Sequence, residues 1–326
     1  MTAAPDWNWH GGAVEAAKRH FGGGNRPWLD LSTGINPHCW PGADTIAIDW
    51  HRLPEREALA GLEAAAAAHF GAAPHHVCAV PGSEVGLRLI GRILGGAAHH
   101  VAPSYRTHGE MFAGTAPIAR GEARAFAGTL VLANPNNPDG HVTDTASFDA
   151  MLAGREGWLL VDEAFADCDP AASVAHRVQD EAPLIVFRSF GKFFGLAGVR
   201  LGFVIAPAPV LAPLRALLGA WPVSAAAIAI GAAAYRDRGW VEAMRERLFG
   251  EAAALDAMLG RHGFAPKGDC PLFRLIDTDD AYDLFDRLAR AAILTRPFAD
   301  QRRWLRFGLP GSGEALDRLD AALAYD

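Results

Sequence analysis

The sequence contains little lysine and little cysteine, and both shortages restrict what the protein can do. Three lysines (Lys18, Lys192 and Lys267) stand beside 27 arginines, so arginine fills nearly every basic position. A lysine that remains inside an apolar run is therefore expected to have a chemical reason. The four cysteines are Cys39, Cys78, Cys168 and Cys270. Their spacing fits neither a zinc site nor a disulfide framework, which predicts reduced thiols and a cytoplasmic protein.

The sequence also has no excess of basic over acidic residues, no signal peptide and no convincing membrane span. The formal net charge is −7, which argues against a nucleic-acid-binding protein. The start, MTAAPDWNWHGG, has no basic segment followed by an apolar run, so no export is expected. Residues 216–235 are uncharged for long enough to span a bilayer, but they are rich in alanine and interrupted at Trp221-Pro222. We expect a long buried helix there and no membrane partner.

Short apolar runs alternate with helical patterns up to about residue 207, and this alternation predicts an α/β fold with a mostly parallel sheet. Most of the runs end in small or polar residues, and ligands in open α/β sheets bind at the carboxyl ends of the strands. These ends are Gly82-Ser83, Ser104, Asn134, Asp162 and Ser189. We expect an N-terminal arm at residues 1–40, a large domain at 41–207, and an interdomain helix with a smaller α+β domain at 208–326.

Lys192 lies in RSFGKFFGLAGVRLGF, residues 188–203, between Ser189 and Arg200. A hydroxyl, a guanidinium and the glycine-flanked amides around them suit a phosphate group. An amine in apolar surroundings suits an imine, because desolvation lowers its pKa. An exposed loop lysine is the plain alternative. Together the residues indicate an aldehyde cofactor that carries a phosphate, which is pyridoxal phosphate.

Pyridoxal phosphate needs further partners, and the sequence offers a candidate for each. Asp162 ends an apolar strand and suits the ring nitrogen, although a helix N-cap is the alternative. Asn137, in LANPNNPDG, suits the phenolic oxygen, and Tyr105 can stack on the ring. The amides of Gly82-Ser83-Glu84 and the Ser83 hydroxyl lead into a helix, where phosphate binds well.

This ordered set resembles the fold type I pyridoxal-phosphate enzymes, and GLAGVRLGF with NPNNPDG is similar to their histidinol-phosphate aminotransferase branch. The resemblance implies a parallel-sheet large domain with a smaller C-terminal domain and an arm. It makes Lys192 the Schiff-base residue, Asp162 the pyridinium partner and Asn137 the O3' partner. Ser189 and Arg200 become phosphate ligands. A homodimer is also implied, although Leu53-Pro54 stands where many aminotransferases have Tyr-Pro.

The arm resembles a narrower group, the L-threonine-O-3-phosphate decarboxylases of cobalamin biosynthesis. HGG at His10–Gly12, WLDLSTGINP at Trp28–Pro37 and Phe165 in place of the usual tyrosine carry this resemblance. It implies decarboxylation of L-threonine O-3-phosphate. An aminotransferase of the histidinol-phosphate type and a non-catalytic cofactor-binding protein of the pathway remain alternatives.

The expected substrate carries two anions, a carboxylate and a phosphate. By resemblance Arg306 binds the carboxylate, and Arg296 is a further candidate for either anion. His10 and Asn36 complete the substrate pocket from the arm. The pairs His75-His76 and His99-His100 are not expected to bind a metal, because adjacent side chains point apart on a helix or strand.

Overall fold

The structure, a computed structural model, describes residue 7, residues 11–22 and residues 26–324. It forms two compact units. The sheet unit comprises Cys39–Asn137 and His141–Met244, and the terminal unit comprises Met1–His38, Pro138–Gly140 and Arg245–Asp326. The predicted domain limits at residues 40 and 207 remain a prediction, because compactness alone does not say which segments fold independently.

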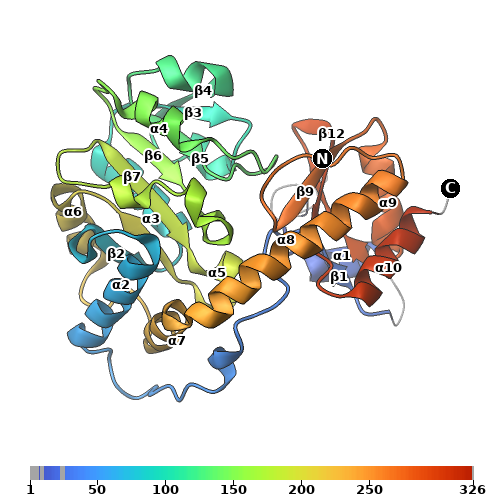
Figure 1. The fold of residues 1–326 in the computed structure, drawn as a ribbon, viewed down its shortest axis with the longest axis horizontal. Coiled ribbons are helices and arrows are strands. Elements are labelled where there is room, and N and C mark those ends of the chain that lie inside the picture. The colour runs from blue at the N-terminus through green and yellow to red at the C-terminus, as the bar shows by residue number, and fades with distance from the viewer. Residues whose placement is uncertain (1–6, 8–10, 23–25, 325–326) are drawn as a thin grey trace. The chain divides into compact units, whose positions relative to one another are not determined.

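The sheet unit contains seven strands in the order β2-β8-β7-β6-β5-β3-β4 (Figure 1). Their bounds are β2 Val77–Val80, β3 Ala97–Ala102, β4 Gly114–Ala119, β5 Leu130–Ala133, β6 Leu159–Asp162, β7 Leu184–Ser189 and β8 Gly202–Ile205. Strand β8 pairs antiparallel with β2 and with β7, and the other neighbouring pairs are parallel. The predicted mostly parallel sheet is confirmed. Strand β8 therefore begins at the edge where the others end.

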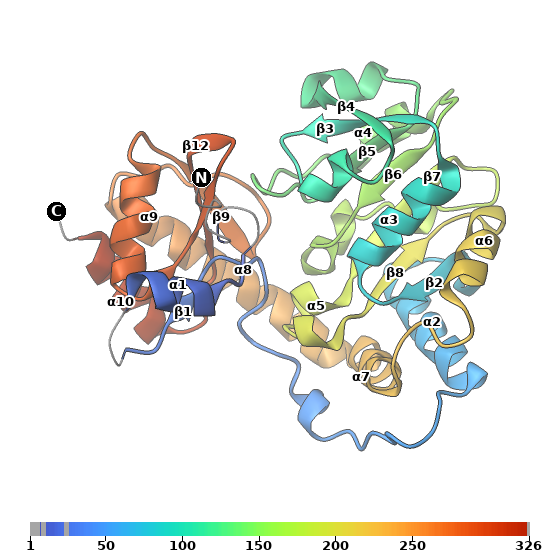
Figure 2. The same ribbon diagram turned by 180° about the vertical axis from the view of Figure 1, so that it is seen from behind.

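Helices cover both faces of this sheet. They are α2 Arg56–Phe70, α3 Ser83–Leu94, α4 Thr145–Leu152, the single turn α5 Phe190–Phe193, α6 Ala208–Leu218 and α7 Ala225–Arg236. Alternate strand residues such as Val131 and Leu160 form a buried core with Leu87 of α3 and Leu211 of α6. Figure 2 shows α3 and α6 in front of the sheet. Helix α2 packs on β2 and α7.

The terminal unit joins the arm to the C-terminal part of the chain. The elements are α1 Val14–Phe21, β1 Leu29–Asp30, β9 Phe273–Asp277, α9 Ala281–Arg290, β10 Ile293–Leu294, β11 Arg296–Phe298, β12 Gln301–Gly308 and α10 Gly313–Leu323. Helix α8, Arg238–Arg261, belongs to both units. The arm adds β1 parallel to β10, and Gly308 donates its amide to Leu31 O at 2.7 Å. Strands β11, β12 and β9 form an antiparallel sheet.

The expectation of one long helix across residues 216–235 is wrong. Helix α6 ends at Leu218, and α7 begins only at Ala225 after the Ser224 side chain caps it by accepting from Ala227 N. Gly219 has a φ of +76°, and Pro222 cannot donate a helical hydrogen bond. Among the described residues, no helix is long and apolar enough to cross a membrane.

All four cysteines are free thiols. Cys78, Cys168 and Cys270 are buried, and Cys39 is exposed. Burial raises the pKa of Cys78 and of Cys270 to about 12, which keeps both protonated and unreactive at neutral pH. The thiols therefore play a packing role where they are buried. A cytoplasmic location remains a prediction.

A buried arginine at the end of β7 forms ion pairs with two carboxylates that follow β6. Arg188 of β7 is 2% exposed and donates from Nη1 to Glu163 Oε2 at 2.8 Å and from Nη2 to Asp167 Oδ1. His69 Nε2 lies 3.0 Å from Asp167 Oδ1. Burial alone would raise the pKa of the Asp167 carboxyl, but Arg188 and His69 hold it well below its usual range. The group is thus a buried charge network in which both carboxylates have cationic or hydrogen-bonding partners.

Replacing Arg188 by methionine should lower the free energy of unfolding by about 3–5 kcal/mol, because Glu163 and Asp167 would remain buried without their cation. Urea unfolding followed by circular dichroism measures this. The matched control is Arg52→Met, whose exposed pair with Asp49 should contribute little. A loss for Arg188→Met no larger than for Arg52→Met would contradict the importance of the network.

Candidate active site

One pocket of the sheet unit lies where β2, β3, β5, β6 and β7 end and β8 begins. All nine residues predicted to bind the cofactor line this pocket: Gly82, Ser83, Glu84, Tyr105, Asn137, Asp162, Ser189, Lys192 and Arg200. Ala133, Ala164, Phe165, Gly191, Ala197 and Leu201 complete its lining. Residues that lie up to 118 positions apart thus meet at one edge of the sheet, as the strand ends predicted.

Asp162 is the last residue of β6 and is 5% exposed. Its Oδ2 lies 3.0 Å from His108 Nε2, and its Oδ1 accepts from Ala164 N at 3.1 Å. His108 is fully buried in the turn Arg106–Gly109 that follows Tyr105. The imidazole therefore orients the carboxylate toward the pocket. The contact of His108 with Asp162 was not predicted from the sequence, because a single histidine in a short turn has no pattern that indicates burial.

Glu84 holds the phenol of Tyr105. Tyr105 Oη donates to Glu84 Oε2 at 2.9 Å, and Arg88 Nε donates to Glu84 Oε1 at 2.6 Å. Burial alone would raise the pKa of Glu84, but hydrogen bonds from Arg88, Thr107 and Tyr105 lower it. Burial, and then the charge of Glu84, raise the pKa of Tyr105 to about 12. The Glu84 carboxylate thus fixes the Tyr105 ring. Because this side chain is negatively charged, only the backbone N–H of Glu84 is suited to bind an anion.

Two glycines create a cradle for an anion at the start of α3. Gly82 has a φ of +90°, and a Cβ there would lie 2.7 Å from Arg200 Nη2. A Cβ on Gly202 would lie 2.4 Å from Ser83 N. The absence of side chains lets the Arg200 guanidinium approach the first amides of α3, which have no acceptor within the helix. This combination fits the phosphate of pyridoxal phosphate.

Lys192 lies in α5, directly after β7, and its Nζ is 5.8 Å from the centroid of the Phe165 ring. Phe165 is buried. Gly191 lets α5 pack closely on the next turn, since a Cβ there would lie 2.6 Å from Ala197 Cα. The amine therefore stands in a pocket with an aromatic wall, which fits a lysine that reacts with an aldehyde.

The three asparagines of NPNNPDG have different tasks. Asn134 donates to Ala172 O at 2.9 Å and accepts from Thr143 N at 2.8 Å. Asn136 donates to Pro103 O at 3.1 Å. These two side chains hold the loop after β5. Asn137 lines the pocket, and its hydrogen bond to the phenolic oxygen of the cofactor stays a prediction.

The predicted substrate arginines lie in the terminal unit. Arg306 of β12 is 3% exposed, donates from Nη2 to Ser32 O at 2.9 Å, and stands opposite Arg296 of β11 in the strand register. Burial, and then the charge of Arg296, lower the pKa of Arg306 to about 9. Two guanidinium groups side by side favour an anion between or beside them.

Asn36 and His10 are the two arm residues predicted for the substrate pocket. Asn36 is buried, and its Oδ1 accepts from His38 N at 2.9 Å, which forms a tight turn. This turn gives Asn36 a structural task. His10 lies outside the described residues.

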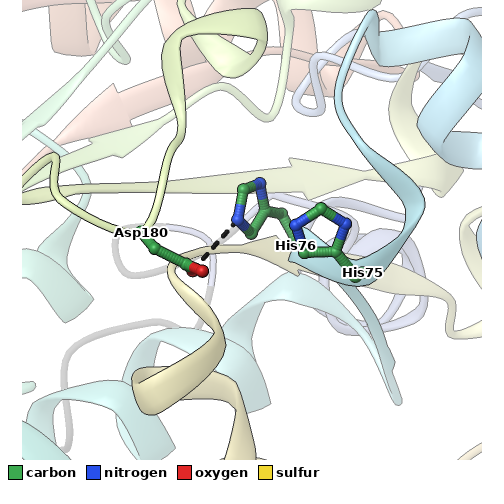
Figure 3. A group of neighbouring side chains, drawn as sticks. All are labelled: His75, His76 and Asp180. Carbon is green, nitrogen blue, oxygen red and sulfur yellow. Dashed lines mark hydrogen bonds and ion pairs between the residues drawn. The ribbon is translucent and has the colours of Figure 1, made fainter.

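The expectation that His75 and His76 point apart is wrong (Figure 3). Both lie in the 3₁₀ turn η3, Pro74–His76, which is neither α-helix nor strand. Their ring centroids are 4.0 Å apart, and His76 Nε2 lies 3.1 Å from Asp180 Oδ1. The turn is three residues long and passes directly into extended backbone at Val77, so the rule for a regular helix or strand does not apply to this pair. His99 and His100 lie in β3, where neighbours do point to opposite faces.

Comparisons with known proteins agree with this geometry. The sequence model of the family described as "Aminotransferase class I and II" matches residues 118–323. The threonine-phosphate decarboxylase of Pseudomonas aeruginosa is 42% identical over 96% of this chain and 96% of that protein. The threonine-phosphate decarboxylase of a Sinorhizobium species is 40% identical over 97% of each.

A solved structure shows the same fold. The histidinol-phosphate aminotransferase from Sinorhizobium meliloti, in complex with pyridoxal-5'-phosphate, superposes with a TM-score of 0.81 at 21% identity. The superposition covers 99% of this chain and 97% of that one. With the family match over residues 118–323, the chain belongs to the aminotransferase class I and II family.

Proposed function

We propose that this protein decarboxylates L-threonine O-3-phosphate to (R)-1-amino-2-propanol O-2-phosphate, a reaction of cobalamin biosynthesis. The observation that carries the proposal is the single pocket that unites Lys192, Asp162 and the Arg200 cradle. The two threonine-phosphate decarboxylases that match nearly the whole chain support the choice of substrate. The cofactor is pyridoxal 5'-phosphate, which the sheet-edge pocket fits.

When bound, pyridoxal phosphate supplies a sink for the electrons that a broken bond leaves on the substrate Cα. Asp162 holds a proton at the pyridine nitrogen, and His108 keeps its carboxylate oriented. Arg200, Ser189 and the start of α3 hold the phosphate. Tyr105, fixed by Glu84, covers the ring. Lys192 would hold the cofactor through its amine, and its Nζ would be the group that returns a proton to Cα.

Phe165 and Asn137 line the same pocket and would differ in what they offer the phenolic oxygen of the cofactor. Phenylalanine has no hydroxyl, so it cannot donate a hydrogen bond to that oxygen. The Asn137 amide is then the donor that the pocket offers. The buried Phe165 ring also excludes water from the side of Lys192.

The substrate residues are proposed from chemistry and resemblance. A buried guanidinium on β12 suits the substrate carboxylate, which assigns that anion to Arg306. Arg296 suits the second anion, the substrate phosphate, and His10 and Asn36 are further candidates from the arm. By holding the carboxylate, Arg306 would orient the substrate for loss of that group.

Transamination is the second candidate, because the solved structure with the same fold is a histidinol-phosphate aminotransferase. In that reaction the Cα–H bond would break instead. The two reactions differ in whether carbon dioxide forms and in whether a keto-acid acceptor is needed.

Purified enzyme with bound cofactor should release carbon dioxide from L-threonine O-3-phosphate without any keto acid. Mass spectrometry of the product and a carbon dioxide assay measure this. Lys192→Ala should lower turnover by at least about 10³-fold. Lys267→Ala is the matched control, since Lys267 pairs with Asp277 at the surface, and it should retain activity. Turnover that requires a keto acid would identify an aminotransferase instead.

Arg306→Ala should lower kcat/KM for L-threonine O-3-phosphate, because a buried charge-assisted pair loses one partner. The loss of transition-state stabilisation should be about 2–5 kcal/mol. The loss should appear more in KM than in kcat, because the carboxylate loses its charge as it leaves. Steady-state kinetics measures both constants. The cofactor absorbance should be unchanged, and the exposed Arg302→Ala is the matched control. An unchanged kcat/KM would remove Arg306 from the substrate site.

A homodimer is the expected assembly. Trp50 and Leu53, which precede α2, are 73% and 62% exposed, and Trp221, between α6 and α7, is 58% exposed. These exposed apolar side chains are candidates for burial by a second copy of the chain. Light scattering at micromolar concentration should give twice the chain mass of 34.7 kDa. The mass of one chain at full activity would argue against a dimer.

A further inference from the structure

His75, His76 and Asp180 form a second cluster of chemically active side chains in the sheet unit (Figure 3). The two histidines belong to the turn that leads into β2, and Asp180 belongs to the loop that leads into β7. The cofactor pocket lies at the other ends of these same strands. The cluster therefore has no part in the proposed reaction and does not depend on it.

The ligand atoms of the three side chains converge. One ring nitrogen of each histidine and one oxygen of Asp180 lie within 4.8 Å of one another. Ligands bound about 2.0–2.2 Å from one ion in a tetrahedral site stand about 3.3–3.6 Å apart, so shifts of about 1 Å in the side chains would bring all three onto it. The His75 side chain is exposed, so its ring can make this shift toward the carboxylate.

The carboxylate is held in place. Ala208 N, at the start of α6, donates to Asp180 Oδ1 at 2.8 Å, and His76 Nε2 lies 3.1 Å from the same oxygen. A hydrogen-bonded carboxylate beside two imidazoles matches the way that metal ligands are usually supported by neighbouring groups.

We propose that His75, His76 and Asp180 bind one divalent transition-metal ion, with zinc as the best match. Two imidazoles and a carboxylate favour borderline ions such as Zn²⁺ and Co²⁺ over Mg²⁺, which prefers oxygen ligands. The ion replaces the proton shared by His76 and Asp180 and joins the two loops. Its role is to clamp the starts of β2 and β7.

The burial of His76 limits the affinity. His76 Nδ1 is buried without a hydrogen-bond partner, and a metal at Nε2 would place the ring proton there. An unsatisfied buried donor costs about 10- to 100-fold in affinity. Three protein ligands also bind less tightly than the four of a structural zinc site. We therefore expect micromolar rather than nanomolar binding.

Untagged holoenzyme, stripped of metal with a chelator, should bind one Zn²⁺ per chain in isothermal titration calorimetry. Co²⁺ should give the visible absorption of a low-coordinate site, and Mg²⁺ should give no heat. His75→Ala and Asp180→Asn should each lower the Zn²⁺ affinity at least about 10-fold, since each removes a ligand. Both positions are exposed, so both variants should fold and keep their decarboxylase activity.

His51→Ala provides the matched control, because His51 is an exposed histidine outside the cluster, and its Zn²⁺ affinity should equal that of the unaltered protein. Bound Zn²⁺ should also raise the melting temperature of the unaltered protein and not that of His75→Ala. Absence of binding at micromolar Zn²⁺ would overturn the proposal. So would equal affinities for His75→Ala and His51→Ala.

Discussion

The pairing of Arg188 with Glu163 and Asp167 is the interaction on which the cofactor pocket depends. Successive residues of a strand point to opposite faces, so a residue that is pinned on one face fixes its neighbour on the other. Glu163 follows Asp162, and Arg188 precedes Ser189. The buried ion pair below the sheet edge thereby positions two pocket residues above it.

Strand direction explains why a phosphate cradle can form here at all. Five parallel strands end at the pocket, and their ends supply hydroxyl, carboxylate and amide groups. Arg200 comes from the opposite direction, because β8 is antiparallel and begins at the same edge. Arg200 has a φ of +54°, an uncommon conformation for a residue with a side chain, and it stands two residues before β8 begins.

Much of this arrangement was predictable from sequence, and the exceptions have physical reasons. Lys192, Asp162 and Asn137 follow strand ends, and such positions converge in any open parallel sheet, although their roles remain predictions. His108 was missed because its burial comes from a turn and from its contact with Asp162, which no local pattern encodes. The prediction of one long helix at residues 216–235 was wrong because it gave more weight to the alanine content than to Gly219 and Pro222, which interrupt the helix. Likewise, His75 and His76 lie in a three-residue turn that passes directly into extended backbone at Val77, and the rules for regular helices and strands do not cover such a turn.

Cys39 provides the chain with a natural reporter position. It is the exposed one of four free thiols and the first residue of the sheet unit, directly after the last arm residue of the terminal unit. The buried thiols are shielded, and those of Cys78 and Cys270 have raised pKa values, so a maleimide dye or nitroxide would attach at Cys39 without any substitution. Fluorescence or spin-resonance spectroscopy of that single label would report on the surroundings of residue 39 in solution, before and after substrate is added.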